Sequence, residues 1–479
     1  MEKNLHFYNK LSFYLISASL FFWDIRYIPE NLNINGNSLD KLLNYLELRF
    51  IYLICIIPII FYIKNYLNSK ILSKNFLIYS FAIFVFLLFH QFFTNINIFN
   101  IQELFYVILI FISLIIIKVY GMFFLKNKIV FIKFITFSSI FFYILSLFIF
   151  DFLNIKNNFG EELTWNKFNF EPCKKGFFNE FNFIFSESSH FGMVAISLFL
   201  TNFYYIFKTN FKDKSLVICF FIFSFILLNN ISLTTIVGVI VCQIAIILAN
   251  FRKENFKYIT ASILMIVIFI FVLLGFQSCK LKFNNATWLI KQKVPFLKMN
   301  LDKMTETFKK ETINEYQGKK YKLKVNSKKE KAFEKEFVLT KSTDLSSAVL
   351  AHNLRVAHKS ILSKPLGWGI NRYEDAFEFY TKYEINEINH TYAIYVNNQD
   401  GSTNYVKIIS EFGIFSLFLV LVYTIFIFSP RIDISDKIFL FPIIFVQVFL
   451  RGAGYFNGGF LITTLLIIFL ILRAYERKV

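Results

Sequence analysis

Long runs of apolar residues, separated by short polar stretches, recur along most of this chain. A helix needs about 20 apolar residues to cross the hydrocarbon core of a bilayer, and lipid offers no partner to an unpaired backbone group. The pattern therefore predicts an all-α polytopic membrane protein. We expect about twelve transmembrane helices, at residues 9–24, 47–63, 75–94, 102–119, 130–151, 190–207, 215–229, 231–249, 258–276, 404–428, 437–453 and 458–473.

Two long polar segments interrupt this alternation. The first is an outer loop at about residues 152–187, and the second is a large loop at 277–403. The large loop separates transmembrane helices 1–9, within residues 1–276, from transmembrane helices 10–12, within residues 404–479. We expect this organisation because no apolar run within the large loop is long enough to cross a bilayer.

The large loop is predicted to contain short helices. Apolar residues recur at helical spacing over 295–317 and over 344–363. In the second helix Asp344 is the expected N-cap. The expected apolar stripe consists of Leu350, Leu354 and Ile361.

Lysine and arginine residues divide unevenly between the two sides of the predicted helices. With the N-terminus inside, every inside segment carries at least two of them, whereas the short outside loops near residues 98 and 230 carry none. Cytoplasmic loops are enriched in Lys and Arg, so we expect cytoplasmic termini and two extracytoplasmic long loops. The first apolar run lacks a small-residue cleavage site, so we expect it to be retained.

Composition and charge agree with a membrane protein and narrow its partners. The chain is 56% apolar and only 17% charged, which excludes an ordinary soluble enzyme. The formal net charge is +19, and much of the excess lies in the large loop. An extracytoplasmic basic loop is an unlikely place for nucleic acid, so the expected partners are lipid head groups or phosphate-bearing substrates. A solvated basic surface without a ligand is the alternative.

The five cysteines fall into two groups. Three lie in predicted transmembrane helices, whereas Cys173 and Cys279 lie one in each long loop. Disulfides form on the oxidising side of a membrane, so we expect these two to be bonded. Two unrelated free thiols are the alternative. No CxxC pair is present, so a zinc site is not expected.

Segment 186–191 (SESSHF) lies where the sixth predicted helix begins. Glu187 and His190 are three residues apart and share a helix face. Ionisable side chains at a membrane boundary are costly, which makes this pair a candidate functional site. The alternative is a helix cap, with Ser186 as N-cap and Glu187 favoured by the helix dipole.

His352, Arg355 and Lys359 follow helical spacing on the helix predicted at 344–363. We expect them to form a cationic stripe facing away from the leucines. Such a stripe binds phosphates, and an arginine does so with two parallel hydrogen bonds. An ordinary solvated helix face is the alternative. The segment 365–369 (PLGWG) then turns the chain back toward the bilayer.

Two further groups of residues reach the same membrane face. Segment 400–402 (DGS) precedes the tenth predicted helix, and 411–413 (EFG) lies within its first turns. Segment 451–455 (RGAGY) closes the eleventh helix, and its glycines indicate close backbone packing. The chain has no Gly-rich phosphate loop, HExxH motif or GxSxG elbow, so we expect no ATP hydrolysis, metal or cofactor.

In these motifs the chain resembles the O-antigen polymerase and O-antigen ligase superfamily. The resemblance covers about residues 180–460 and depends on the order of the motifs, with the large loop before the tenth helix. The motifs that carry it are 186–191, Arg355 followed by 365–369, 400–402 running into 411–413, and 451–455.

The resemblance implies a metal-independent inverting glycosyltransferase. Such an enzyme joins sugar repeats carried on undecaprenyl diphosphate at the outer face of the bacterial inner membrane. Arg355 and Arg451 would stabilise the leaving diphosphate. The proton of the acceptor hydroxyl would go to Glu187, His190 or Asp400. Further substrate contacts are expected from His352, Lys359, Ser402 and Tyr455.

One departure from the family pattern separates two activities. Ligase-like members carry a His about nine residues before the Glu of a Glu-x-Gly motif, whereas this chain has Ser402 there. The departure favours a polymerase over an O-antigen ligase. A lipid-linked oligosaccharide flippase is the alternative from another class, but a transporter would show internal repeats and charges near mid-bilayer.

The resemblance and the composition together define the expected surroundings of the protein. The expected location is the bacterial inner membrane, with many spans, both termini in the cytoplasm and the large loop outside. The expected partners are an undecaprenyl-diphosphate-linked oligosaccharide, the lipid bilayer and a chain-length regulator. The sugar, its linkage and the oligomeric state do not follow from the sequence.

Overall fold

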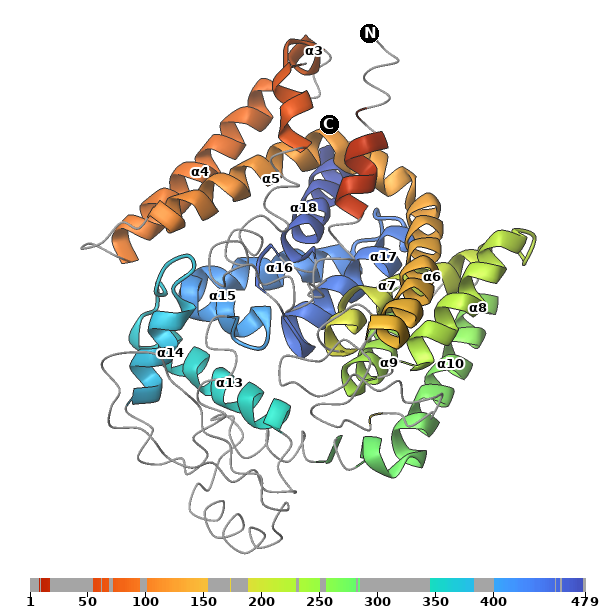
Figure 1. Ribbon diagram of the computed structural model, residues 1–479. Helices are drawn as coiled ribbons and strands as arrows, with labels where there is room; N and C mark the ends of the chain where they lie inside the picture. The colour runs from red at the N-terminus through yellow and green to blue at the C-terminus, as the bar shows by residue number, and fades with distance from the viewer. Residues whose placement is uncertain are drawn as a thin grey trace, which may run out of the picture.

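Every regular element in the described part of this computed structural model is a helix (Figure 1). The described residues are 8, 10–17, 55–61, 63–68, 72–94, 101–153, 173, 188–229, 232–249, 256–280, 283–284, 345–382, 400–452, 454–456 and 459–476. The main helices are α3 (Ile63–Asn68), α4 (Lys74–Thr94), α5 (Ile101–Lys126), α6 (Lys128–Leu153), α7 (Ser188–Lys208), α8 (Lys214–Asn229), α9 (Leu233–Ala249), α10 (Phe256–Gly275), α13 (Leu345–Ser363), α14 (Tyr373–Lys382), α15 (Asn404–Phe412), η5 (Gly413–Phe415), α16 (Ser416–Phe428), α17 (Ile434–Phe445), η6 (Val446–Leu450) and α18 (Phe460–Glu476).

Several of these helices suit a membrane. Five are long and apolar enough to cross one, namely Phe76–Thr94, Glu103–Lys126, Phe191–Lys208, Phe256–Gly275 and Asn404–Phe428. The all-helical class is therefore confirmed. The count of twelve transmembrane helices stays a prediction, because the first two predicted spans are described only in part.

Helix α7 is enclosed by its neighbours. It packs along α17 and against α8 and α9. At the α9 contact, a Cβ added to Gly192 would lie 2.8 Å from the hydroxyl of Thr235, and one added to Gly238 would lie 2.5 Å from Ile196. Small residues let helices approach closely inside a membrane. Helices α4, α10 and α16 instead present large apolar side chains outward.

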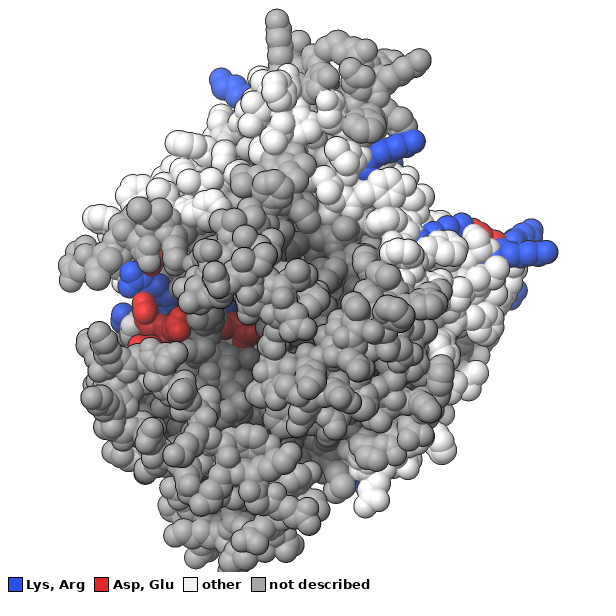
Figure 2. Space-filling model, in the orientation of Figure 1, with Lys and Arg blue, Asp and Glu red and all other residues white. Residues whose placement is uncertain are grey.

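Charged pairs join segments that the sequence predicts on the cytoplasmic side. Lys133 of α6 contacts Asp213, in the turn between α7 and α8, with Nζ and Oδ2 3.2 Å apart. Lys128 of α6 pairs with Asp436 of α17 and donates a hydrogen bond to Ser435 at 2.9 Å. Figure 2 shows a charged projection on the right, where the α7–α8 turn lies. These contacts bring three of the predicted inside segments together.

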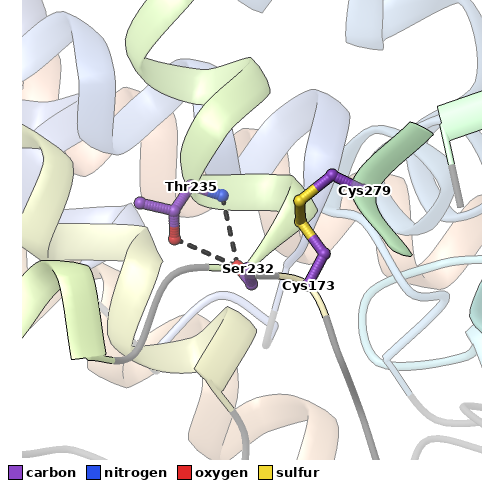
Figure 3. The surroundings of a disulfide bond; sticks show 4 residues. All are labelled: Cys173, Ser232, Thr235 and Cys279. Atoms are coloured by element: carbon purple, nitrogen blue, oxygen red, sulfur yellow. Dashed lines mark hydrogen bonds between the residues drawn. A yellow bond between two sulfur atoms is a disulfide. The ribbon is translucent and has the colours of Figure 1, made fainter. Parts of the chain in front are cut away.

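A disulfide joins the two long polar segments. Cys173 and Cys279 are bonded, with Cα atoms 5.0 Å apart and 106 residues between them in sequence. Figure 3 shows the bond beside Ser232 and Thr235, where α9 begins. The Thr235 amide donates to the Ser232 hydroxyl, which caps this helix. The bond therefore fixes residue 173 of the outer loop against the chain that follows α10.

Helix α13 confirms the helix predicted at 344–363, but its buried face is not the predicted one. The expected leucine stripe is only partly buried. The side chains that α13 buries are Val349, Asn353, Val356, Ala357 and Ser360. This face packs on α14 and α15, where small and polar side chains allow a close approach and a hydrogen bond from Asn353. The predicted helix 295–317 lies outside the described residues.

His352 differs in its position from the two cations that follow it. It is buried, and its ring lies edge-on to Phe377 with centroids 5.3 Å apart. Arg355 and Lys359 are partly exposed. The predicted cationic stripe is therefore covered by α14 at His352 and is partly exposed only at Arg355 and Lys359.

Candidate functional site

Two of the sequence motifs meet through their backbones. The turn 365–369 between α13 and α14 lies against the end of α15. The amide of Gly369 donates to the carbonyl of Glu411 at 3.0 Å, and the amide of Ile414 donates to the carbonyl of Pro365 at 2.8 Å. Segments more than forty residues apart in sequence therefore form one unit.

Glycine is required on both sides of this contact. A Cβ on Gly367 would lie 2.2 Å from the Glu411 carbonyl oxygen, and one on Gly413 would lie 1.9 Å from the Pro365 carbonyl oxygen. Both glycines also have positive φ, +88° and +54°, where other residues are strained. The two motifs thus carry glycine because their backbones touch.

Glu411 is the buried centre of this unit. It is 0% exposed, and its Oε1 lies 3.8 Å from Lys407 Nζ. Its oxygens accept hydrogen bonds from the amides of Asn371 at 3.0 Å and Tyr373 at 3.2 Å. Its Oε2 also accepts one from the Tyr455 hydroxyl at 2.5 Å. A carboxyl group with these partners holds the start of α14 and the end of the 451–455 segment in place.

Two buried tyrosines complete the contacts around Glu411. Burial raises the pKa of Tyr373 well above its ordinary value, and Asp400 and Glu411 raise it further. Burial and the adjacent Glu411 likewise raise the pKa of Tyr455. Both phenols therefore stay protonated and act as hydrogen-bond donors. The Tyr373 hydroxyl donates to Asn353 Oδ1 at 2.7 Å.

A second buried polar group fixes the same turn from the side of α4 and α5. Arg372 Nε lies 2.5 Å from Oε1 of Glu103, which is nearly fully buried, and Arg372 also pairs with Asp375 at 3.3 Å. Gln91 of α4 donates to Glu103 and accepts a hydrogen bond from the Ile370 amide at 2.7 Å. Figure 2 shows acidic and basic atoms together in a recess near α14.

His90 of α4 also contacts the turn between α13 and α14. Its Nε2 lies 2.8 Å from the carbonyl oxygen of Leu366, so this nitrogen carries the proton and donates. Its ring stacks on Phe412, with centroids 5.1 Å apart. Hydrogen bonds and an ion pair therefore join the segment between α13 and α14 to α4, α5 and α15.

A chain of hydrogen bonds joins α13 to the remaining motifs. Asn353 Nδ2 donates to the Ser402 hydroxyl at 2.7 Å, and the Ser402 carbonyl accepts from the amide of Gly452 at 2.8 Å. The Asp400 side chain accepts from the Ser402 amide at 2.9 Å and so stabilises the 400–402 turn. Segments 400–402 and 451–455 are thus linked directly to the helix that carries Arg355.

The predicted cations lie beside these links. Arg355 is two residues from Asn353 on α13 and is partly exposed, as is Lys359. Arg451 follows η6, is partly exposed, and precedes the Gly452 amide that binds Ser402. Tyr455 and Ser402 are buried. Tyr455 and Ser402 therefore join the motifs by hydrogen bonds and do not line an open surface.

The proposed acid–base pair at the start of α7 is described only in part. Glu187 lies outside the described residues, and of His190 only the helical backbone is described. Gly192, two residues further, contacts Thr235 of α9. Helix α9 also contacts η6, which ends before Arg451. The first turns of α7 and the end of η6 therefore both lie against α9.

Sequence reasoning included Glu411 in the 411–413 motif but gave it no role, and it did not place Glu103, Gln91, Asn353 or Arg372 in the site. A signal was present for Glu103, because a carboxyl group at the start of an otherwise apolar helix is costly unless it is paired. The partners could not be found from sequence, since Arg372 is 269 residues away.

Neither a protein-family model, nor a curated protein, nor a solved structure matches this chain. Within the described ranges, no group of three or more His, Cys, Asp or Glu side chains could hold a metal ion.

Proposed function

We propose that this protein is a polymerase of glycan repeat units, transferring undecaprenyl-diphosphate-linked glycan onto another lipid-linked repeat. One observation carries the proposal beyond the resemblance in sequence. Four motif segments, 365–369, 400–402, 411–413 and 451–455, belong to one hydrogen-bonded unit with α13. Motifs that serve one reaction are expected to lie together, whereas chance matches are not.

In this proposal the two arginines bind the donor. A hydroxyl oxygen of the acceptor sugar attacks the anomeric carbon of the donor, and the bond from that carbon to the diphosphate oxygen breaks. The diphosphate leaves with the electron pair. Arg355 and Arg451, both partly exposed, stabilise the growing negative charge. A guanidinium suits this role because it offers two donors to two phosphate oxygens.

The proton of the acceptor hydroxyl passes to a carboxylate or an imidazole. Asp400 is held by the Ser402 amide and is half-buried, so it is oriented yet accessible. Glu187 and His190 remain the other candidates. Glu411 is buried with several hydrogen-bond partners, so we assign it a positioning role instead.

The proposal also sets the protein's orientation. Both termini lie in the cytoplasm of a bacterium, and the segment with α13 and α14 lies at the outer face of the inner membrane. The substrate is there after its transfer across the membrane, and a chain-length regulator is the expected protein partner. The contacts between Lys133 and Asp213 and between Lys128 and Asp436 suit this orientation, because they join loops predicted on one side.

The glycan ladder of cells lacking this protein tests the proposal. We expect the surface glycan to carry a single repeat, and the wild-type gene to restore the ladder. Loss of all repeats, with lipid-linked polymer accumulating, would identify a ligase. Single repeats trapped on the cytoplasmic side would identify a flippase. Either result would reject the polymerase.

A further inference from the structure

The turn between α13 and α14 exposes large apolar side chains. Leu362 is 69% exposed and Leu366 is 50% exposed, and Pro365 between them is exposed as well. Lys364 lies over the Trp368 ring, with its Nζ 3.6 Å from the ring centre. We call these five residues the turn edge. Clustered exposed apolar side chains indicate a contact surface.

Hydrogen bonds hold the turn edge against the ends of two apolar helices. The carbonyl of Pro365 accepts from the amide of Ile414, directly before α16. The carbonyl of Leu366 accepts from His90, near the end of α4. The turn edge therefore cannot move away from these helix ends without breaking these hydrogen bonds.

The exposed apolar surfaces of α4 and α16 end next to the turn edge. In the Asn404–Phe428 span, the α15 part is covered by protein and carries buried polar side chains. Outward-facing apolar side chains begin only with Ile414 and continue through Phe415, Leu417 and Phe418. On α4 the last exposed apolar side chains are Phe89, Phe92 and Phe93. The outward-facing apolar surface of α4 and α16 therefore reaches the turn edge, whose exposed apolar side chains extend this surface.

We propose that the turn edge docks on the lipid bilayer, with Leu362 and Leu366 at the boundary between head groups and acyl chains. Trp368 is partly exposed beside them, and tryptophan is enriched at membrane–water interfaces. The Lys364 stem can lie along apolar surface while its ammonium reaches lipid phosphates. The docking does not depend on the polymerase activity. If that activity holds, docking also sets the height of α13 and Arg355 above the membrane.

Spin labels at the turn edge test the docking. Cys55, Cys219 and Cys242 are first replaced by Ala, and the Cys173–Cys279 bond is kept. Single nitroxides are then placed by Leu362→Cys and Leu366→Cys, in nanodiscs of phosphatidylethanolamine with some phosphatidylglycerol. Matched references are Phe418→Cys on α16 and Glu378→Cys on the exposed side of α14.

We expect labels at 362 and 366 to collide more with oxygen than with a water-soluble nickel chelate, as at 418, and the label at 378 to show the reverse. A preference for nickel at 362 and 366 would place the turn edge in water. Protection from both reagents would mean that protein covers it. Either outcome overturns the proposal.

A second measurement keeps every cysteine in place. With Trp23, Trp165 and Trp288 replaced by Phe, the fluorescence reports on Trp368 alone. We expect quenching by lipids brominated high on the acyl chain and little quenching by acrylamide. Strong acrylamide quenching without lipid quenching would contradict the docking.

Discussion

Gly413 touches Pro365 backbone to backbone, so closely that a Cβ on Gly413 would lie 1.9 Å from the Pro365 carbonyl oxygen. The neighbouring Ile414 amide donates to that same oxygen at 2.8 Å. Because the neighbouring atoms are backbone atoms, a side chain added at Gly413 could not be accommodated by a change of rotamer nearby. The turn that follows α13 and the end of α15 therefore move as one body, and glycine at this position is a structural requirement.

Replacing Gly413 by Ala should destabilise the protein. The φ of +54° alone costs about 1–3 kcal/mol for a residue with a side chain, and the collision with Pro365 adds to this. We expect a lower melting temperature and lower abundance in detergent. Gly275→Ala is the matched control, because its added Cβ meets nothing nearer than 3.7 Å. Equal melting temperatures for the two variants would contradict the backbone contact.

The buried pair between Glu103 and Arg372 should couple strongly. Removing one partner leaves the other charge buried and costs about 3–5 kcal/mol. We expect Arg372→Met alone to lower stability more than Arg372→Met combined with Glu103→Gln. Thermal unfolding of the two single variants and the double variant measures the coupling.

The pair between Lys133 and Asp213 provides a control for that cycle. Both of its side chains are about one-third exposed, so the coupling should stay below about 1 kcal/mol. Equal coupling energies for the two pairs would contradict a buried, strongly coupled pair of Glu103 and Arg372.

The helices could be predicted from the sequence, because a helix depends on the local pattern of apolar and polar residues. The apolar runs predicted α4 to α10 and α15 to α18, and the spacing over 344–363 predicted α13 within one residue, whereas α14 was not predicted. The sequence also favoured the bond between Cys173 and Cys279, since each long loop holds a single cysteine.

The internal contacts of the site could not be predicted. Gln91, Glu103 and Arg372 meet because α4 and α5 cross the α13–α14 turn, and no local pattern encodes that crossing. The buried face of α13 was also mispredicted. Hydrophobicity favoured its leucines, whereas the helix buries Asn353 and Ser360 because hydrogen bonding and close approach to α15 outweigh side-chain size.

Removing the disulfide should lower the stability without changing the fold. Cross-linking residues 106 apart restricts the unfolded chain, and a native disulfide typically contributes about 2–4 kcal/mol. We expect Cys173→Ser with Cys279→Ser to melt at a lower temperature than the wild type. A reductant should lower the wild-type value and leave the double variant unchanged. Detection of both residues as free thiols in a non-reducing peptide map would refute the bond.

Substitutions at Arg355 test whether this side chain binds the donor phosphates or is only a solvated surface charge. Loss of a charge-assisted contact that strengthens in the transition state costs about 2.7–4 kcal/mol, a hundred- to thousandfold in rate. We expect Arg355→Ala to lose activity by this factor, and Arg355→Lys not to restore it, because an ammonium is a point charge. Lys359→Ala is the neighbouring control and should have a smaller effect. Full-length polymer from Arg355→Ala at normal abundance would remove Arg355 from the site.

Glu187→Gln distinguishes the candidate bases. The change keeps the shape and removes the charge, so a base loses its function while a helix cap is largely retained. If Glu187→Gln is active while Asp400→Asn is inactive, Asp400 is the preferred base. Initial rates of repeat-unit transfer at equal protein amounts measure the difference. Normal activity in both variants, and in His190→Ala, would reject all three candidates.

The most direct measurement uses the purified protein in nanodiscs with a synthetic repeat unit on undecaprenyl diphosphate. The account predicts glycans of two and more repeats, with one undecaprenyl diphosphate released for each bond formed, and the loss of both products in Arg355→Ala. Unchanged substrate in the presence of folded wild-type protein, or transfer of the glycan to another acceptor only, would contradict the proposed polymerase.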